Sequence, residues 1–121
     1  MSSLAENLLL NHEVMPYLPP TVITANGDSG STPLLITRGH TVVFFINVTA
    51  VSGTSPTLNV YIDIQDPISG AWANQYSFPQ ITAVGLYYQP LQVQSTKYRV
   101  RWVLGGISPS FTFAVNVVII K

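Results

Sequence analysis

The stretch TLNVYIDIQDPISGAW, residues 57–72, constrains the fold more than any other part of the chain. Apolar and polar residues alternate over residues 58–65, which is the period of a strand with one buried face. The segment Asp66-Pro67-Ile68-Ser69-Gly70 then places Asp, Pro and Gly where a tight turn prefers them. Trp72 opens a returning strand that we expect to end near Ser77. The stretch therefore predicts an antiparallel hairpin.

Similar alternating segments recur along the chain at short, fairly regular spacing, with no convincing helix between them. We predict further strands over residues 21–25, 34–37, 41–49, 86–93, 97–104 and 111–120. Residues 52–56 and 105–109, rich in Ser, Gly and Pro, are predicted loops. About eight such strands indicate an all-β fold, specifically an antiparallel two-sheet β-sandwich that is jelly-roll-like.

The more apolar phase of each predicted strand identifies its buried face. On this criterion Phe44, Ile62, Trp102 and Phe113 are predicted to lie in the core. Residues 41–49 and 111–120 also carry apolar side chains on their other face, where Val43 and Phe45 need partial cover of their own.

Residues 1–20 differ from the β-sandwich domain that we expect over residues 21–121. Pro16, Pro19 and Pro20 end any short helix, and the segment shows no alternation with which to join a sheet. We therefore predict an extended N-terminal arm that packs on another subunit. Its candidate interface side chains are Leu8, Leu9, Leu10, Met15, Tyr17 and Leu18.

Charged residues make up only 8% of the 121 residues, whereas a typical soluble domain has about 25%. A small domain with so few charges has to cover its surface with neutral polar and apolar groups, and monomeric proteins usually carry more charge. This composition predicts a homo-oligomer or a subunit of a larger assembly, with a homotrimer as the favoured form.

The cations are unevenly placed, because Lys97, Arg99 and Arg101 share the outward face of one predicted strand. One interpretation is a solvated strand face. The other is a basic ribbon that meets an acidic surface, either on a neighbouring protein or on the arm through Glu6 and Glu13. We therefore include these three cations among the candidate protein-interface residues.

Several kinds of chemistry find no support in the sequence. The chain has no cysteine, and its two histidines, His12 and His40, lie far apart. Asp63 and Asp66 are the one close acid pair, and the turn already accounts for Asp66. Five basic residues balanced by five acids argue against nucleic-acid binding. No stretch approaches the roughly 20 apolar residues of a membrane helix. We expect no catalytic activity, no metal, no cofactor, no nucleic acid and no membrane as partner.

Five segments resemble a recurrent pattern in small structural proteins of tailed bacteriophages. They are VTAVSGTSPTL at residues 48–58, the turn at residues 66–72, FPQITAVG at 78–85, YRVRW at 98–102 and GGISPSFTF at 105–113. The resemblance covers residues 41–120 and implies a virion component, most naturally a head decoration (cement) protein. Such proteins are small β modules, often trimeric, that clamp the major capsid protein at the capsid surface, commonly with an extended N-terminal arm.

Two other functions stay open on the sequence. One is a tail or neck structural subunit with the same fold and a different partner. The other is a carbohydrate-binding adhesin module, in which Trp72, Tyr87 and Tyr88 form a stacking platform for sugar rings.

Overall fold

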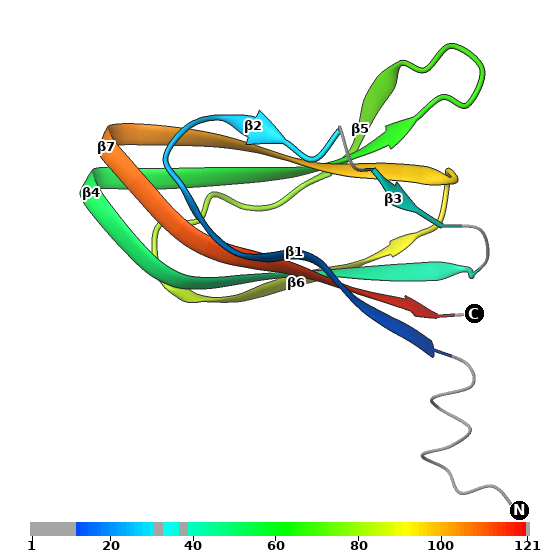
Figure 1. The fold of residues 1–121 in the computed structure, drawn as a ribbon, viewed down its shortest axis with the longest axis horizontal. Coiled ribbons are helices and arrows are strands. Elements are labelled where there is room, and N and C mark those ends of the chain that lie inside the picture. The colour runs from blue at the N-terminus through cyan, green and yellow to red at the C-terminus, as the bar shows by residue number, and fades with distance from the viewer. Residues whose placement is uncertain (1–11, 31–32, 37–38, 121) are drawn as a thin grey trace, which may run out of the picture.

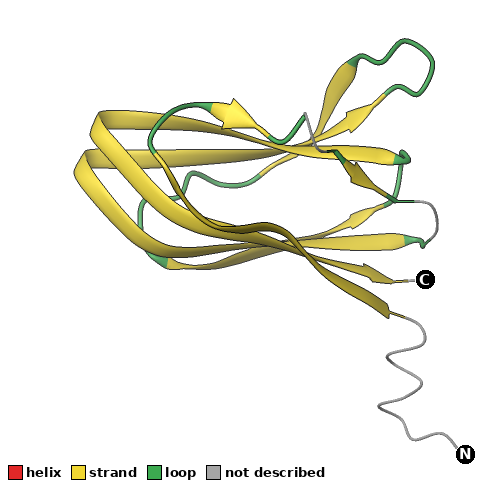
Figure 2. Cartoon of the chain, viewed as in Figure 1, coloured by secondary structure: helices red, strands yellow, loops and turns green. Residues whose placement is uncertain are grey.

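The structure, a computed structural model, describes residues 12–30, 33–36 and 39–120. Strands account for 76% of the described residues and pair antiparallel, and these residues form no helix (Figure 2). The predicted all-β class is therefore confirmed. In the same part of the chain, nothing has the length and hydropathy of a membrane-crossing helix. The strands are β1 (His12–Ile23), β2 (Gly27–Asp28), β3 (Leu34–Leu35), β4 (Thr41–Gln65), β5 (Trp72–Ser77), β6 (Gly85–Gln92) and β7 (Lys97–Ile120).

Two strands, β4 and β7, are far longer than the usual strand of about 5–6 residues, with 25 and 24 residues. They pair along their whole length, from Thr41 opposite Ile120 to Ile64 opposite Tyr98. The predicted loops at residues 52–56 and 105–109 are therefore strand segments. The two stretches lie opposite each other, and Thr54 pairs with Ile107 between two register shifts, so the ladder continues across them instead of ending in separate turns.

The same two stretches form a bend. The β4–β7 register shifts three times between Val48 and Thr57, and positive φ angles occur at Gly53 (112°) and Gly106 (99°). A Cβ atom on either glycine would lie 2.6 Å or less from a backbone oxygen of the opposite strand. Glycine is therefore required at both positions. Figure 1 shows both strands folding back here, so that the sheet turns over into two facing layers.

Each layer contains half of β4 and half of β7 with shorter strands on either side. The β1 layer has the order β6, residues 41–48 of β4, residues 113–120 of β7, and β1. The β5 layer has the order β5, residues 57–65 of β4, residues 97–105 of β7, and then β2 and β3. Figure 1 shows the two layers facing each other, joined by the bend at one end.

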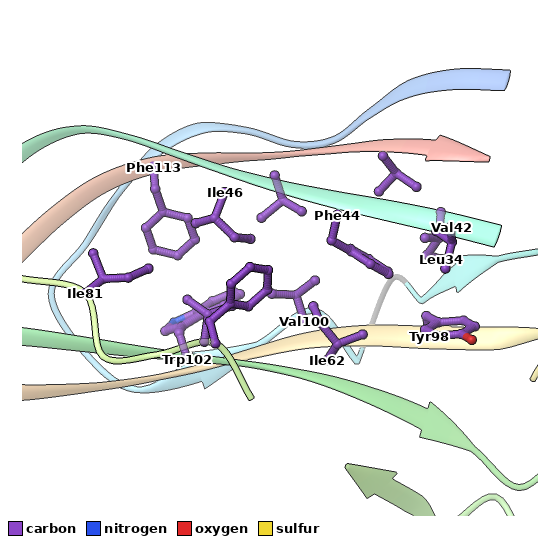
Figure 3. Packing of buried hydrophobic residues seen from close by; sticks show 14 of the residues in the cluster. Leu34, Val42, Phe44, Ile46, Ile62, Ile81, Tyr98, Val100, Trp102 and Phe113 are labelled. Carbon is purple, nitrogen blue, oxygen red and sulfur yellow. The ribbon is translucent and has the colours of Figure 1, made fainter. Parts of the chain in front are cut away.

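The hydrophobic core lies between the layers (Figure 3). Phe44, Ile62 and Phe113 are fully buried and Trp102 is 8% exposed, which confirms the four predicted core positions. Trp102 meets Phe113 edge-on at 5.8 Å between ring centroids, and Phe44 lies 5.8 Å from Tyr98. Both contacts join residues of different layers, so the aromatic rings hold the layers together.

The predicted hairpin is present as expected. Asp66 accepts backbone hydrogen bonds from Gly70 and, through its side chain, from Ile68, while Gly70 has a φ of 78°. The returning strand β5 spans Trp72–Ser77, with the bounds that the sequence predicts. Local turn chemistry therefore determines this part of the fold.

The N-terminal segment differs from the expectation of a separate arm. Strand β1 begins at His12 and pairs with β7 from Ile120 to Phe111, so the predicted boundary at residue 20 falls inside a strand. Two register shifts, between Pro16 and Leu18 and between Leu18 and Thr21, accommodate the prolines. Proline is tolerated here because β1 is an edge strand with one free side. The prolines interrupt the alternation, which is why the sequence pattern hides the strand.

Three of the predicted arm residues, Met15, Tyr17 and Leu18, pack against the core of their own chain. The Tyr17 hydroxyl also donates to Oγ of Ser29 at 2.7 Å, and this oxygen accepts the Val100 N–H at 2.9 Å. The bond links β1 to the first half of β7 in the other layer. Leu8, Leu9 and Leu10, the remaining predicted arm contacts, lie outside the described residues.

We predict that Phe113→Ala lowers the free energy of unfolding by about 3–5 kcal/mol, because it removes a fully buried ring and leaves a cavity. Urea denaturation followed by tryptophan fluorescence would measure the loss. Thr112→Ala, the adjacent residue on the other face of β7, is the matched control. A similar loss in both variants would show that the ring is not the cause.

Deletion of residues 1–20 should lower the free energy of unfolding by at least about 2 kcal/mol, because it removes the core contacts of Met15, Tyr17 and Leu18. Deletion of residues 1–11, which leaves every described strand intact, is the control and should change it little. Thermal unfolding of both truncated proteins would test this. Equal midpoints for the two would contradict the assignment of β1 to the folded domain.

Candidate interaction surface

The two layers present outer faces of different chemistry. Among the described residues, the outer side of the β5 layer and its adjoining turn carry nearly all of the charged groups. These are Asp28, Asp63, Asp66, Lys97, Arg99 and Arg101. The β1 layer contains one described charged residue, Glu13, which pairs with Ile119, a residue of the inner side. The outer face of the β1 layer is therefore free of charge over its described rows.

Apolar side chains form a large part of the outer face of the β1 layer, in register across its strands. One row crosses all four strands as Pro90, Val43, Val118 and Val14. In the next row Tyr88 stacks on Phe45, with 5.7 Å between ring centroids, and the row continues to the polar Asn116 on β7. We call this surface the apolar face and define it by Val14, Val43, Phe45, Leu86, Tyr88, Pro90 and Val118.

The strands at the edges expose the apolar face most. Val14 on β1 is 68% exposed, and Leu86 and Tyr88 on β6 are 60% and 62% exposed. Scattered apolar residues are ordinary on a protein surface, but a contiguous uncharged patch across four strands is typical of an interaction site. The geometry therefore marks the apolar face as the candidate functional surface.

The opposite outer face is organised around Asp63, whose side chain is buried although it points away from the core. Its Oδ2 accepts from Arg99 Nε at 2.8 Å and Arg101 Nε at 3.0 Å, and its Oδ1 accepts from Asn74 Nδ2 at 3.1 Å. The Arg99 guanidinium lies 4.8 Å from the centroid of the Trp72 ring. The two arginines thus cover the carboxylate.

This network determines the protonation of the carboxylate. Burial by itself raises the pKa of Asp63, but hydrogen bonds from Arg101, Arg99 and Asn74 outweigh it, and the pKa lies below its ordinary value. Asp63 is therefore ionised at neutral pH and neutralises one of the two arginine charges.

The predicted basic ribbon does lie on one strand face, but two of its members have partners within the chain. Arg99 and Arg101 bond to Asp63, while Lys97 is exposed at the start of β7. Glu13 belongs to the other layer, on β1. Contact of this ribbon with a neighbouring protein stays a prediction. Pairing with Asp63 lowers the net positive charge that the ribbon would present to an acidic partner.

The aromatic residues proposed for sugar stacking do not gather in one place. Trp72 lies on β5 beneath Arg99, whereas Tyr88 lies on the apolar face against Phe45. Tyr87 points to the other side of β6, where its hydroxyl donates to the Ala83 carbonyl at 2.8 Å. Trp72 does line an open groove of about 790 Å3, together with the 93–96 loop.

Sequence reasoning found part of the apolar face. The second apolar side of residues 41–49 and 111–120 indicated that Val43 and Phe45 need cover. Nothing in the sequence showed that β6 and β1 would flank these strands and extend the surface, because lateral strand order depends on long-range pairing. The described residues contain no group of three potential metal ligands.

Comparison with known proteins adds little to this description. No protein-family model matches the chain, and no curated protein matches it. Among solved structures, it is similar to the crystal structure of PirA at 12% identity, over 92% of this chain and 85% of that one, with a TM-score of 0.33. A likeness at this level supports no conclusion about fold or function.

We predict that the Asp63 network stabilises the protein and makes its stability fall in acid. Because the folded pKa is lowered, the contribution is complete above the ordinary value of 3.8 and is lost as the pH falls below it. Asp63→Asn should cost roughly 1.5–3 kcal/mol at neutral pH and should flatten this acid loss. Asp28→Asn removes the same charge at a more exposed position and is the control. Chemical denaturation across the acid range would measure both, and identical pH profiles for Asp63→Asn and the unmodified protein would contradict the prediction.

Proposed function

We propose that the protein is a non-enzymatic structural component of a virion, a decoration protein that binds the major capsid protein at the capsid surface. The observation that carries the proposal is the separation of the two outer faces. One face holds two arginines paired with Asp63, and the other is uncharged, with one apolar row that continues across four strands. A lattice of repeated subunits offers such a face a large, stationary partner.

The pairing pattern supports a jelly-roll architecture, which we propose as the finer description of the fold. If each long strand is counted as two at its bend, and β2 with β3 as one, the described part of the chain has eight strands. Each layer then has four, in the orders β6–β4–β7–β1 and β5–β4–β7–β2/β3. Jelly rolls of eight strands are found in viral capsid proteins, as well as in lectin domains and cupins.

Resemblance to small tailed-phage proteins supports the same assignment from the sequence side. The segments that carry it include both halves of the bend, at residues 48–58 and 105–113, and the strand segment 98–102 that holds the two arginines. These segments determine the fold of the module, and they say less about the identity of the protein that it binds. The partner is therefore proposed from the chemistry of the apolar face.

Binding through the apolar face has a distinct physical signature. Apolar burial contributes about 25 cal/mol per Å2 removed from water and depends little on ionic strength. Contact through Lys97 and the arginines would instead weaken as salt is added. Binding that survives added salt would favour the apolar face over the basic ribbon.

The location of the protein in the particle tests the proposal most directly. Mass spectrometry of separated heads and tails, from the virus that encodes this chain, should find the protein in heads at a high copy number. Detection in tails alone would support the tail or neck subunit instead. Absence from both would overturn the proposal.

We predict that Val43→Lys abolishes binding to heads, because it places a charge at the centre of the apolar face. Val103→Lys is the matched control, since Val103 occupies the equivalent outward position on a central strand of the β5 layer. Co-sedimentation of each purified variant with heads that lack the protein would measure binding. Equal binding of the two variants would show that the apolar face is not the contact.

A further inference from the structure

The β1 layer has two edges, and they differ in how the chain protects them. At one edge, β1 contains Pro16, Pro19 and Pro20, which interrupt the row of backbone donors. At the other edge, β6 pairs with β4 on one side, and no strand in the described part of the chain pairs with its other side. An unpaired edge of this kind is a template for another strand.

The register shows which residues of β6 face the open side. The Val93 N–H donates to the His40 carbonyl at 2.9 Å, so Val93 points toward β4. Pairing of β6 with β4 continues without a register shift from Gln92 to Gly85, and backbone direction alternates along a strand. The N–H and C=O groups of Leu86, Tyr88, Pro90 and Gln92 therefore face outward from the edge.

Two of these four outward-facing residues, Pro90 and Gln92, already have partners within the chain for their carbonyl groups. Pro90 has no N–H, and its carbonyl accepts a hydrogen bond from Gln89 Nε2 at 3.0 Å. The Gln92 carbonyl accepts one from Gln75 Nε2 at 2.9 Å. The part left open consists of Leu86 and Tyr88, whose side chains are also among the most exposed apolar groups of the protein.

We propose that a second copy of this chain pairs with the open part of β6, antiparallel and around a two-fold axis that passes between Tyr87 and Tyr87 of the partner subunit. Leu86 then lies opposite Tyr88 of the partner subunit, and Tyr88 lies opposite Leu86 of the partner subunit. Both are pairs in which two residues exchange N–H and C=O, so the contact has four backbone hydrogen bonds. The β1 layers of the two copies become one continuous eight-stranded layer.

A second copy fits this edge because the open part is self-complementary. Its two outward-facing residues, Leu86 and Tyr88, flank Tyr87, so a two-fold axis brings each of them opposite the other, and neither is charged, which suits the isologous contact of a two-fold dimer. The axis stands perpendicular to the layer, so both apolar faces lie on the same side. The Phe45–Tyr88 stack of one copy continues into the partner's Leu86 across the junction.

This inference deepens the assembly role proposed above, because the dimer doubles the apolar face offered to a capsid. It is tested without capsids, so its failure and the failure of head binding are separate results. The sequence-based expectation of a homotrimer is one of the outcomes that would overturn it.

Sedimentation equilibrium of the full chain at micromolar concentrations should show a dimer. Tyr88→Pro removes an outward N–H, in the orientation that Pro90 already tolerates, together with the ring that stacks on Phe45, and should weaken dimerisation at least tenfold, or about 1.4 kcal/mol. Leu86→Lys places a charge at the junction and should do the same by repulsion. Ile68→Lys, at a 93% exposed turn position far from β6, is the control and should leave the dimer unchanged. Melting curves identify any variant that loses its fold.

Cysteine pairing tests the register, since the chain has no cysteine of its own. Leu86→Cys and Tyr88→Cys, oxidised as a mixture, should form a mixed disulfide dimer in much higher yield than either variant alone. A monomer or trimer by sedimentation would overturn the proposal. Dimers that are unaffected by Tyr88→Pro and Leu86→Lys, or disulfides that form equally within each single variant, would overturn it as well. So would a monomer that binds an extended strand of another protein at this edge.

Discussion

The whole structure depends on the antiparallel pairing of β4 with β7. It runs from Thr41 opposite Ile120 to Ile64 opposite Tyr98, and every other strand pairs with one member of this ribbon. The ribbon continues across residues 52–56 and 105–109, where its register shifts and Thr54 pairs with Ile107. Because it bends at Gly53 and Gly106, the same two strands form the centre of both layers and enclose the core between them.

One consequence is that a single strand contributes to two surfaces of opposite character. The first half of β4 supplies Val43 and Phe45 to the apolar face, and its second half supplies Asp63 to the charged network. The network holds two of the described cations against an internal carboxylate. The surface with unsatisfied apolar area is then the one suited to assembly, which agrees with the low charge of the chain.

The two edges of the β1 layer are protected to different extents. Prolines protect the edge at β1, and Pro90 with two glutamine side chains closes part of the edge at β6. Monomeric proteins usually protect all of their sheet edges, because an unpaired edge strand promotes association with other chains. Here the open part of β6 is short and adjoins the apolar face, so self-association and docking would use neighbouring residues of one surface.

The sequence by itself determined the local parts of this protein: the turn at residues 66–70, strand β5, the all-β class and the burial of Phe44, Ile62, Trp102 and Phe113. Turn chemistry and two-residue alternation are written within a few neighbouring residues, so they can be read without knowing the fold. Tertiary structure alone decided that β4 continues through residues 52–56 and β7 through residues 105–109. It also decided that residues 12–20 pair with β7 and that Arg99 and Arg101 bond to Asp63. It also placed β6 and β1 beside the second apolar side of the central strands and so created the apolar face. Each of these features depends on a pairing between backbone or charged groups that often lie more than 30 positions apart in the sequence. The pattern of neighbouring residues does not show which distant residue becomes the partner.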